Sequence, residues 1–343
     1  MRVQAIREHL AALGALPEHQ ARVLRDWVQG APHERGRRRP ADYLPKAVRA
    51  ALPSLDHELA SLARVISEHP AQDGSARLLV GLQDGQAVEA VLLPRDGVCV
   101  SSQVGCAVGC RFCMTGKDGL LRQVSSGEIV AQVVLARARR PVRKVVFMGM
   151  GEPAHNLDNV LEAIELLGVE ANIPHKNLVF STVGDPRAFE RLPLGRVKPA
   201  LALSLHTTKP ALRAELLPRA PRLLPAELVA FGERYARLTG YPVQYQWTLL
   251  EGVNDGQDEL DGIVALLRGK YAILNMIPYN TIPGLAFRRP GWDKARAIAA
   301  SLHARGVLTK LRDSAGQDVE GGCGQLRARA GRTIAIAPLP QRV

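Results

Sequence analysis

The sequence predicts an α/β protein in which a partial (β/α)6-type barrel follows a small N-terminal helical domain. Three observations support this prediction. The chain has 343 residues, which is enough for one domain of about 250 residues and a smaller accessory domain. Residues 98–311 alternate between strand-like and helix-like segments, and such alternation indicates a parallel sheet. The first 75 residues instead carry apolar side chains at helical spacing.

About six strand–helix units follow one another in the main domain, and a barrel of this kind carries its functional groups at the carboxyl ends of the strands. The expected strands are Lys144–Met148, Asn177–Thr182, Ala200–Leu205, Val243–Leu250 and Tyr271–Ile277. The expected helices are Gly127–Ala138, Asn156–Gly168, Pro225–Leu238, Asp258–Leu267 and Asp293–Arg305.

The N-terminal region is predicted to contain short helices at Val3–Leu13 and Pro17–Val28, and a third from near Ala41 to just before Pro53. We expect residues 1–75 to form a helical accessory domain. Two roles are open for it, because it could contact a polyanionic partner or only pack against the main domain.

Residues 76–98 are predicted to form a β-hairpin linker between the two domains. Its strands are expected at Ala76–Gly81 and Ala87–Leu93, which alternate and are rich in β-branched residues. The Asp84-Gly85 pair between them is typical of a hairpin turn.

The charge balance favours a polyanionic partner. The chain has 45 Lys and Arg against 33 Asp and Glu, a formal net charge of +12, and such side chains neutralise phosphates. An Arg-rich composition with ordinary solvated charges is the alternative. Candidate phosphate contacts are Arg35–Arg39, Lys144, Lys198, Lys209, Arg327, Arg329 and Arg332.

The ends and the cysteine content predict a reducing compartment. The first residues, MRVQAIREHLAALG, are charged and amphipathic and do not resemble a secretory signal. No stretch approaches the roughly 20 apolar residues of a membrane-spanning helix. Five cysteines are an odd number, which argues against a disulfide framework. We therefore expect a cytoplasmic protein whose cysteines bind metal or perform chemistry.

Three of the cysteines are closely spaced. Cys106, Cys110 and Cys113 form a Cys-x3-Cys-x2-Cys motif, which can bind three irons of a [4Fe–4S] cluster and leave the fourth iron open. S-adenosylmethionine (SAM) can chelate an open iron, and an electron from the cluster can then cleave its sulfonium. This spacing is typical of radical-SAM enzymes. The alternatives are unrelated reduced thiols or a zinc site, although zinc prefers four ligands.

Several ordered motifs carry a resemblance to a known family. The segment from Val100 to Cys113, with Gly127-Glu128-Ile129-Val130 beyond it, is similar to RlmN/Cfr-type radical-SAM RNA methyltransferases, which methylate adenosine at C2 or C8. The similarity extends from about Glu89 to Leu326. Further matching motifs are Phe147–Pro153, Ser181–Gly184, Ser204–His206, Gly252–Asp255, Ile277–Asn280 and Cys323–Leu326.

The resemblance implies a radical-SAM barrel with a [4Fe–4S] cluster on Cys106, Cys110 and Cys113 and with SAM as second cofactor. It makes residues 99–343 the catalytic domain, ending in a loop that carries a reactive cysteine. The implied SAM contacts lie at predicted strand ends and are Gly151, Glu152, Ser181, Ser204, Leu205, His206 and Asn280.

The resemblance also implies covalent chemistry. Adenine C2 and C8 are poor nucleophiles, so they do not accept a methyl group by simple displacement. Cys323 is similar to the cysteine that first takes a methyl group from SAM. A SAM-derived radical then removes hydrogen from that methyl group, and the methylene radical adds to the ring. Cys99 is similar to the cysteine that releases the product by forming a disulfide with Cys323. Glu89 is similar to the general base.

The partners implied are structured RNA, either ribosomal or transfer RNA or both, and a cytosolic electron donor of the flavodoxin type. We expect C2 as the favoured carbon, no membrane association and a monomer. The main alternative is a radical-SAM enzyme of the same fold that acts on a different RNA or on a non-RNA substrate. A non-enzymatic RNA-binding protein with a structural cluster and a zinc module are the others. The flanking segments Thr207-Thr208-Lys209 and Ser314–Val319 depart from the family's usual wording.

Overall fold

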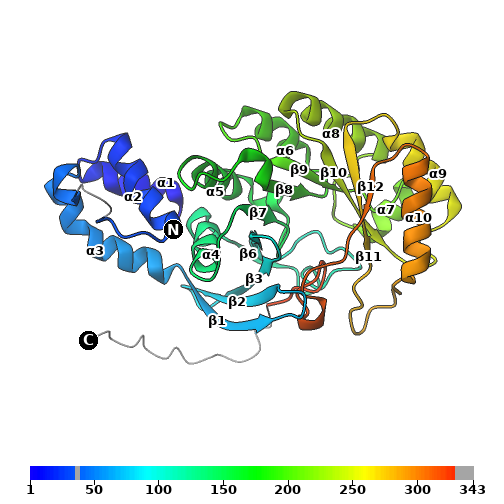
Figure 1. Cartoon of the computed structure of the whole chain (residues 1–343), viewed down its shortest axis with the longest axis horizontal. Coiled ribbons are helices and arrows are strands. Elements are labelled where there is room, and N and C mark those ends of the chain that lie inside the picture. Colours follow the sequence, from blue (N-terminus) through cyan, green and yellow to red (C-terminus); the bar gives the residue numbers. More distant parts are fainter. Residues whose placement is uncertain (35–38, 329–343) are drawn as a thin grey trace.

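The computed structural model describes residues 1–34 and 39–328 (Figure 1). Three of the basic candidates for phosphate contact, Arg35, Arg37 and Arg38, together with Arg329 and Arg332, therefore lie outside the described residues.

One large sheet organises the described part of the chain. Its strands are ordered β1-β2-β3-β4-β7-β8-β9-β10-β11-β12, so neighbours in the sheet follow one another along the chain. From β4 onward all adjacent pairs are parallel, whereas β1 to β4 pair in antiparallel fashion. The strands are β1 Ala63–Pro70, β2 Ala76–Leu82, β3 Ala87–Leu93, β4 Gly97–Cys99, β7 Lys144–Phe147, β8 Leu178–Thr182, β9 Ala200–Ser204, β10 Val243–Leu249, β11 Ala272–Pro278 and β12 Thr309–Leu311.

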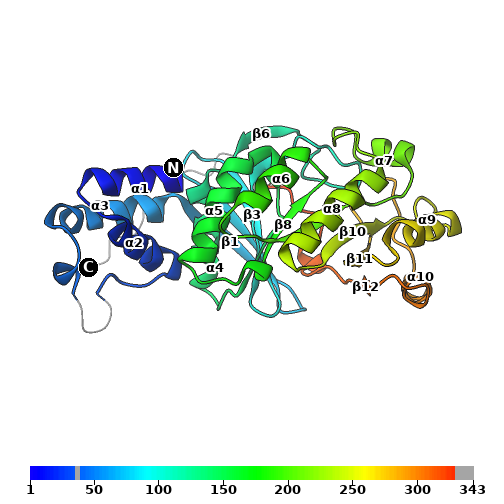
Figure 2. The same cartoon turned by 90° about the horizontal axis from the view of Figure 1, so that it is seen from above.

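Helices connect the parallel strands, and Figure 2 shows α4, α5, α6 and α8 side by side along one face of the sheet. The partial (β/α) barrel is thus confirmed. All five expected strands and five expected helices of the main domain are present, with ends within one residue of prediction. The helices are α4 Ser126–Arg137, α5 Leu157–Val169, α6 Pro186–Arg191, α7 Pro210–Leu216, α8 Pro225–Thr239, α9 Gln257–Leu267 and α10 Trp292–Ala304.

The smaller elements are a two-stranded sheet and short 3-10 helices. The two strands, β5 Gln103–Gly105 and β6 Leu120–Gln123, flank the segment that contains the three clustered cysteines. The short helices are η1 Pro40–Asp42, η2 Pro153–Asn156, η3 His175–Asn177, η4 Leu192–Leu194 and η5 Gln317–Val319.

The N-terminal helices pack against α4 and α5 as a lobe at the left of Figure 1. They are α1 Val3–Ala12, α2 Pro17–Gln29 and α3 Lys46–Ser61. The amide of Val3 donates to Ser126 Oγ at 2.7 Å, and the amide of Gly127 donates to the carbonyl of Met1 at 3.2 Å. The N-terminus of α1 is therefore attached to the first turn of α4.

Two predictions about this region are wrong. Helix α3 does not end before Pro53 but continues through it to Ser61. Proline in a helix interior costs about 3 kcal/mol, and burial of Leu52, Leu55 and Leu59 on the same helix offsets that cost. Residues 63–70 are also not helical, because they form β1, which pairs along its length with β2. Both outcomes depend on tertiary partners that local spacing does not contain.

The predicted hairpin is confirmed as β2 and β3, and β3 also pairs with β4. The hairpin is therefore hydrogen-bonded into the same sheet as the barrel strands. The division of the chain into three domains at residues 75 and 98 stays a prediction. Among the described residues, no helix combines the length and the apolar character needed to cross a membrane.

The segment after β12 crosses from one edge of the sheet to the other, as the red ribbon in Figure 1 shows. Its attachment at β2 and the preceding turn is polar. Arg77 Nε donates to the carbonyl of Val319 at 2.6 Å, and the amide of Gly316 donates to Asp73 Oδ2 at 3.0 Å. Residues 313–328, which include Cys323, thus span the open side of the partial barrel.

Burial of the central strands predicts a measurable difference between two leucines. Leu203 on β9 is 0% exposed and Leu194 is 82% exposed. Leu203→Ala removes buried carbons and leaves a cavity, so we expect the free energy of unfolding to fall by about 3 kcal/mol. Leu194→Ala is the matched control and should change it by less than about 0.5 kcal/mol. Denaturant unfolding followed by circular dichroism measures both, and equal effects would contradict the described packing.

Candidate functional site

A cavity of about 160 Å³ lies at the carboxyl ends of the parallel strands. It brings together groups from the cysteine segment, from the loops after β7 and β9, and from the ends of β8, β9 and β10. The predicted site residues that line it are Cys106, Cys110, Cys113, Gly151, Glu152, Ser181, Ser204, His206 and Cys323. Sequence reasoning assigned no role to three further lining residues, Gln246, Thr248 and Ile277.

The three clustered cysteines lie on a tight loop between β5 and β6. The amide of Cys106 donates to the carbonyl of Gly119 at 2.9 Å and closes the loop. Gly105 has φ +80°, and a Cβ there would lie 2.0 Å from the Gly119 oxygen. Only glycine therefore permits this approach. The loop fixes the cysteines as a group at the cavity rather than along an extended chain.

The thiols fit the cluster that their spacing predicts. All five cysteines are free, and burial raises the pKa of Cys106 to about 12 and that of Cys110 well above its usual range. Iron binding would replace the thiol protons, because thiolate is the ligand form. Within residues 1–34 and 39–328, no three His, Cys, Asp or Glu side chains are arranged around a single metal ion. A cluster places each thiolate on a different iron and so has a different geometry.

Glu152 connects two strand ends at the cavity. Its carboxylate accepts hydrogen bonds from the amides of Ala154 at 3.1 Å and Val183 at 3.0 Å. Burial raises the pKa of Glu152 to about 7, and the hydrogen bonds from Thr182, Val183 and Ala154 oppose that rise. The residue is therefore both a structural connection and, as predicted, an acceptor at the cavity.

His206 has an unusual backbone for a non-glycine residue, with φ +61°. The amide of Thr248 donates to its Nδ1 at 3.0 Å, so the ring proton is on Nε2. Burial, with a smaller contribution from the Arg213 charge, lowers the pKa of His206 to about 3. Phe112 packs edge-on against the ring at 4.8 Å. His206 is thus a neutral donor held at the cavity wall, and left-handed strain of this kind is common at functional sites.

Two predicted SAM contacts do not line the cavity. Leu205 is fully buried among apolar side chains, so only its backbone is available to a ligand. Asn280 uses its Nδ2 to donate to Ser314 Oγ and to the carbonyl of Cys323, both at 2.9 Å. Its Oδ1 is buried and has no hydrogen-bond partner. Contact of either residue with SAM stays a prediction, and the structure gives Asn280 a role in holding the cysteine segment.

Cys323 and Cys99 lie close enough to influence each other. Burial raises the pKa of Cys99 to about 12, and a charge on Cys323 raises it further. Cys323 is exposed at the cavity surface, yet the surrounding protein atoms still raise its pKa, while a hydrogen bond from Ser314 opposes that rise. Ser314 belongs to a segment that departs from the family pattern, so sequence comparison alone gave it no role.

Glu89 lies on β3 and is 2% exposed. Its Oε1 pairs with Arg77 on β2, and its Oε2 accepts from the amide of Arg327 at 2.7 Å. Burial raises the pKa of Glu89, and the charge of Arg77 opposes the rise. Glu89 does not line the cavity with the three cysteines but a second one of about 260 Å³. This second cavity is lined by Glu89, Met114, Lys117, Thr281, Ile282, Pro283, Glu320, Gln325 and Arg327.

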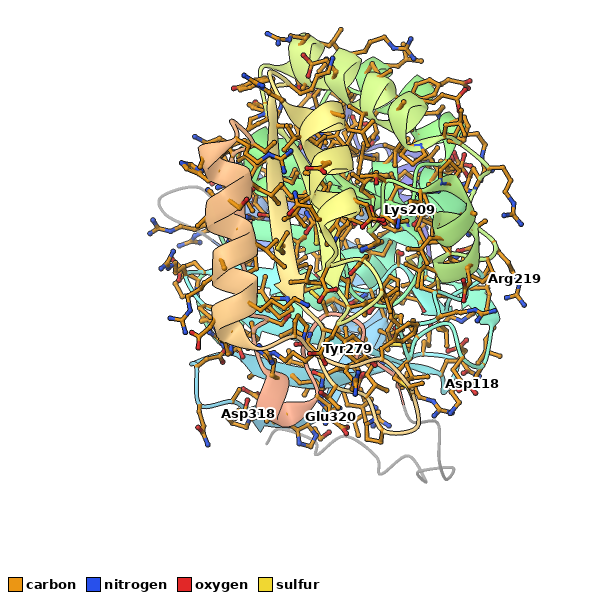
Figure 3. The ribbon with its side chains drawn as sticks, turned by 90° about the vertical axis from the view of Figure 1, so that its right-hand side faces the viewer. Asp118, Lys209, Arg219, Tyr279, Asp318 and Glu320 are labelled. Atoms are coloured by element: carbon orange, nitrogen blue, oxygen red, sulfur yellow. The ribbon has the colours of Figure 1, made fainter. Side chains whose placement is uncertain are left out.

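The other candidate phosphate contacts lie apart from one another. Lys209 pairs with Asp258, and Arg327 pairs with Asp118 at 2.7 Å. Burial lowers the pKa of Lys144, and Lys198 donates to the carbonyl of Gly195 at 3.2 Å. In Figure 3, Lys209 lies above Tyr279 in the view and Asp118 below it to the right. Phosphate contact stays a prediction for each of these residues.

Comparison with known proteins agrees with this geometry. Residues 100–261 match the model of the Radical SAM superfamily. A protein of Methylibium petroleiphilum named a probable RNA methyltransferase is 71% identical over 342 residues, which cover 99% of this chain and 97% of that protein. A second of the same name, from Leptothrix cholodnii, is 69% identical over 343 residues and 99% of each chain.

A solved structure of a radical SAM methyltransferase from Sphaerobacter thermophilus has a TM-score of 0.82 and 34% identity. The match covers 96% of this chain and 98% of that one. The barrel and its cysteine-lined cavity therefore define a radical-SAM enzyme. Near-complete coverage at high identity narrows the class, and the chain belongs to the RlmN/Cfr-type family of radical-SAM RNA methyltransferases.

The cavity geometry predicts the effect of adding one methyl group at Gly151. Gly151 has φ +106°, and a Cβ there would lie 2.6 Å from the Gln103 side chain. Gln103 Oε1 accepts from the amide of Glu152 at 2.7 Å, so Gly151→Ala should displace Glu152. We expect SAM affinity to fall by about tenfold or more. Calorimetric titration of the reconstituted protein measures this.

Gly240→Ala is the matched control for backbone strain. Gly240 also has a positive φ, +72°, but nothing lies within 4 Å of its Cβ position. Both variants should lose about 1–3 kcal/mol of stability from left-handed strain. Only Gly151→Ala should lose SAM affinity, and an equal loss in Gly240→Ala would contradict the assignment of the cavity.

Proposed function

We propose that this enzyme methylates a ring carbon of adenine in structured RNA, with C2 favoured over C8, and that Cys323 carries the methyl-derived carbon. The proposed substrates are ribosomal RNA, transfer RNA or both. The RNA methyltransferase names of the relatives support the substrate class, and the chemistry proposed below explains why a radical enzyme is needed for an unreactive ring carbon.

One observation carries the proposal. The short segment that contains Cys323 contributes to both cavities, since Cys323 and Gly324 line the cavity of the three cysteines and Gln325 and Arg327 line the cavity of Glu89. A carrier that must meet SAM first and an adenine afterwards would need access to both spaces. The second cavity, of about 260 Å³, is therefore the proposed position of the target base.

A [4Fe–4S] cluster on Cys106, Cys110 and Cys113, together with SAM, would supply methyl groups for displacement and a carbon radical for hydrogen abstraction. The residues proposed to hold SAM are Gly151, Glu152, Ser181, Ser204, Leu205, His206 and Asn280. His206 Nε2–H is a donor, and the carboxylate of Glu152 is an acceptor for an ammonium group.

The proposed role of Cys323 begins with displacement. Its sulfur attacks the SAM methyl group, a carbon–sulfur bond forms to Cys323, and the sulfonium bond breaks. After one hydrogen atom has been removed from this methyl group, the methylene carbon adds to the adenine ring. The RNA is then joined covalently to Cys323 through that carbon.

Release needs the two other proposed residues. Once the adduct has given up one electron, Glu89 takes the ring proton. The sulfur of Cys99 then attacks the sulfur of Cys323, and a disulfide forms. The electron pair of the broken carbon–sulfur bond stays on the methylene carbon, which takes a proton and becomes the methyl group. A cellular reductant restores both thiols.

The remaining parts of the proposal concern context. A flavodoxin-type protein would deliver the electron, and the enzyme would act in the cytoplasm as a monomer. Residues 1–75 would form an accessory domain that contacts RNA, 76–98 the hairpin that carries Glu89, and 99–343 the catalytic domain. The net charge of +12 supports a polyanionic substrate.

Isotope labelling tests the proposed function. Reconstituted enzyme is supplied with SAM carrying a trideuterated methyl group and with RNA from a strain that lacks the gene, and nucleosides are analysed by mass spectrometry. Because one deuterium leaves during radical formation and a solvent proton replaces it, the methyladenosine should retain only two. Retention of all three would mean direct displacement, and labelling outside adenine would mean a different substrate.

Variants of the two cysteines give a second prediction. Cys99→Ser should still form the bond between Cys323 and RNA but should not release it, so a nuclease-sensitive protein–RNA adduct should accumulate on denaturing gels. Cys323→Ala and the double variant should form no adduct. Free product from Cys99→Ser at the wild-type rate would contradict the role of Cys99. An adduct in Cys323→Ala would contradict the role of Cys323.

A further inference from the structure

Arg213 on α7 is a buried cation behind the cavity. It is 3% exposed. Its Nη2 donates to the carbonyls of Val183 at 2.5 Å and Ser204 at 3.2 Å, and Nη1 donates to that of Pro221 at 3.4 Å. Val183 and Ser204 both line the cavity of the three cysteines. Arg213 therefore joins the loop after β8 to the end of β9, where the cavity wall is formed.

No carboxylate in the described part of the chain forms an ion pair with Arg213, whose printed partners are backbone carbonyls. Its Nε is buried and has no hydrogen-bond partner. Burying a guanidinium costs free energy unless an anion compensates it. An arginine placed in this way is explained by an anion that the folded chain receives at the adjacent cavity.

The acidic groups that act on Arg213 indicate where this anion belongs. Charges on Cys110 and Glu152 favour the charged form of Arg213, although burial has the larger effect and lowers its pKa. Cys110 is one of the three cluster cysteines. Its helix also packs close to the cysteine loop, since the amide of Arg111 donates to the carbonyl of Leu216 at 3.0 Å.

We propose that Arg213 is a positioning residue that compensates the negative charge of the cysteine-bound cluster and thereby favours the reduced cluster. This inference rests on the proposed function, because it needs the cluster at Cys106, Cys110 and Cys113. Carbonyl contacts hold the guanidinium at a fixed place, and burial keeps solvent from screening its charge. Reduction adds one negative charge to the cluster, so a nearby fixed cation stabilises the product of that step.

The expected effect can be stated as an equilibrium. Removing one unit charge at this depth should lower the equilibrium constant for reduction by about tenfold, which for a one-electron couple corresponds to about 59 mV. Arg213→Gln should therefore have a more negative midpoint potential than wild type. Anaerobic redox titration of the reconstituted full-length protein, followed by electron paramagnetic resonance, measures it. Iron and sulfide contents are determined on the same samples.

Arg219→Gln is the matched control. Arg219 also contacts the cysteine loop, since its Nη1 donates to the carbonyl of Ala107 at 3.1 Å. It is exposed, however, and Figure 3 shows it at the periphery of the view. Solvent screens its charge, so its removal should shift the potential far less than removal of Arg213. Equal shifts in both variants would contradict a specific role for the buried charge.

Arg213→Lys separates charge from structural support. It keeps the positive charge but loses the forked geometry, so we expect a potential equal to that of wild type even if stability falls. This variant also decides the question if Arg213→Gln does not fold or binds no cluster, because a downward shift in Arg213→Lys would overturn the inference.

Failure of the inference can be distinguished from failure of the proposed function. A wild-type protein that binds no cluster would overturn both. A wild-type protein with a full cluster and an Arg213→Gln variant with the same potential would overturn only the role of Arg213. Neither result depends on measuring RNA methylation.

Discussion

The parallel direction of the strands from β4 to β12 is the constraint on which the site depends. Parallel strands place all their carboxyl ends at one edge of the sheet, and the following loops must meet there. The Cys113 loop and His206 are far apart in sequence yet line one cavity for this reason. The crossing segment then adds Cys323, which is anchored through Arg77 at β2 and through Asn280 after β11. Any movement of Cys323 must therefore work against contacts at both ends of this segment.

Hydrogen bonds to buried polar groups keep these loops in place. Glu152 accepts from Val183 on the next strand, and Gln103 accepts from the amide of Glu152. His206 accepts from Thr248 in the same way. In a medium of low dielectric constant such bonds are strong, and a broken one is costly. Polar groups at the strand ends thus shape the cavity before any ligand enters, and a radical enzyme needs a site that is already closed to water.

The sequence predicted the barrel accurately because strands buried on both faces read as apolar runs. It missed β1 and the continuation of α3 through Pro53, since both depend on distant partners. The departure at Thr207 and Thr208 was also uninterpretable from sequence. In the fold both hydroxyls donate to Glu259 on α9, which is fully buried. A carboxylate more than fifty residues away supplies the reason, and no local pattern contains it.

The same burial that protects the site sets a requirement for its chemistry. Both Cys99 and Cys106 have a pKa of about 12, chiefly because burial disfavours the thiolate. Metal binding can offset this cost at Cys106, since iron stabilises the thiolate directly. Cys99 has no such help, and at neutral pH it is almost entirely protonated. Its attack on Cys323 therefore requires that its proton leave before or during formation of the sulfur–sulfur bond.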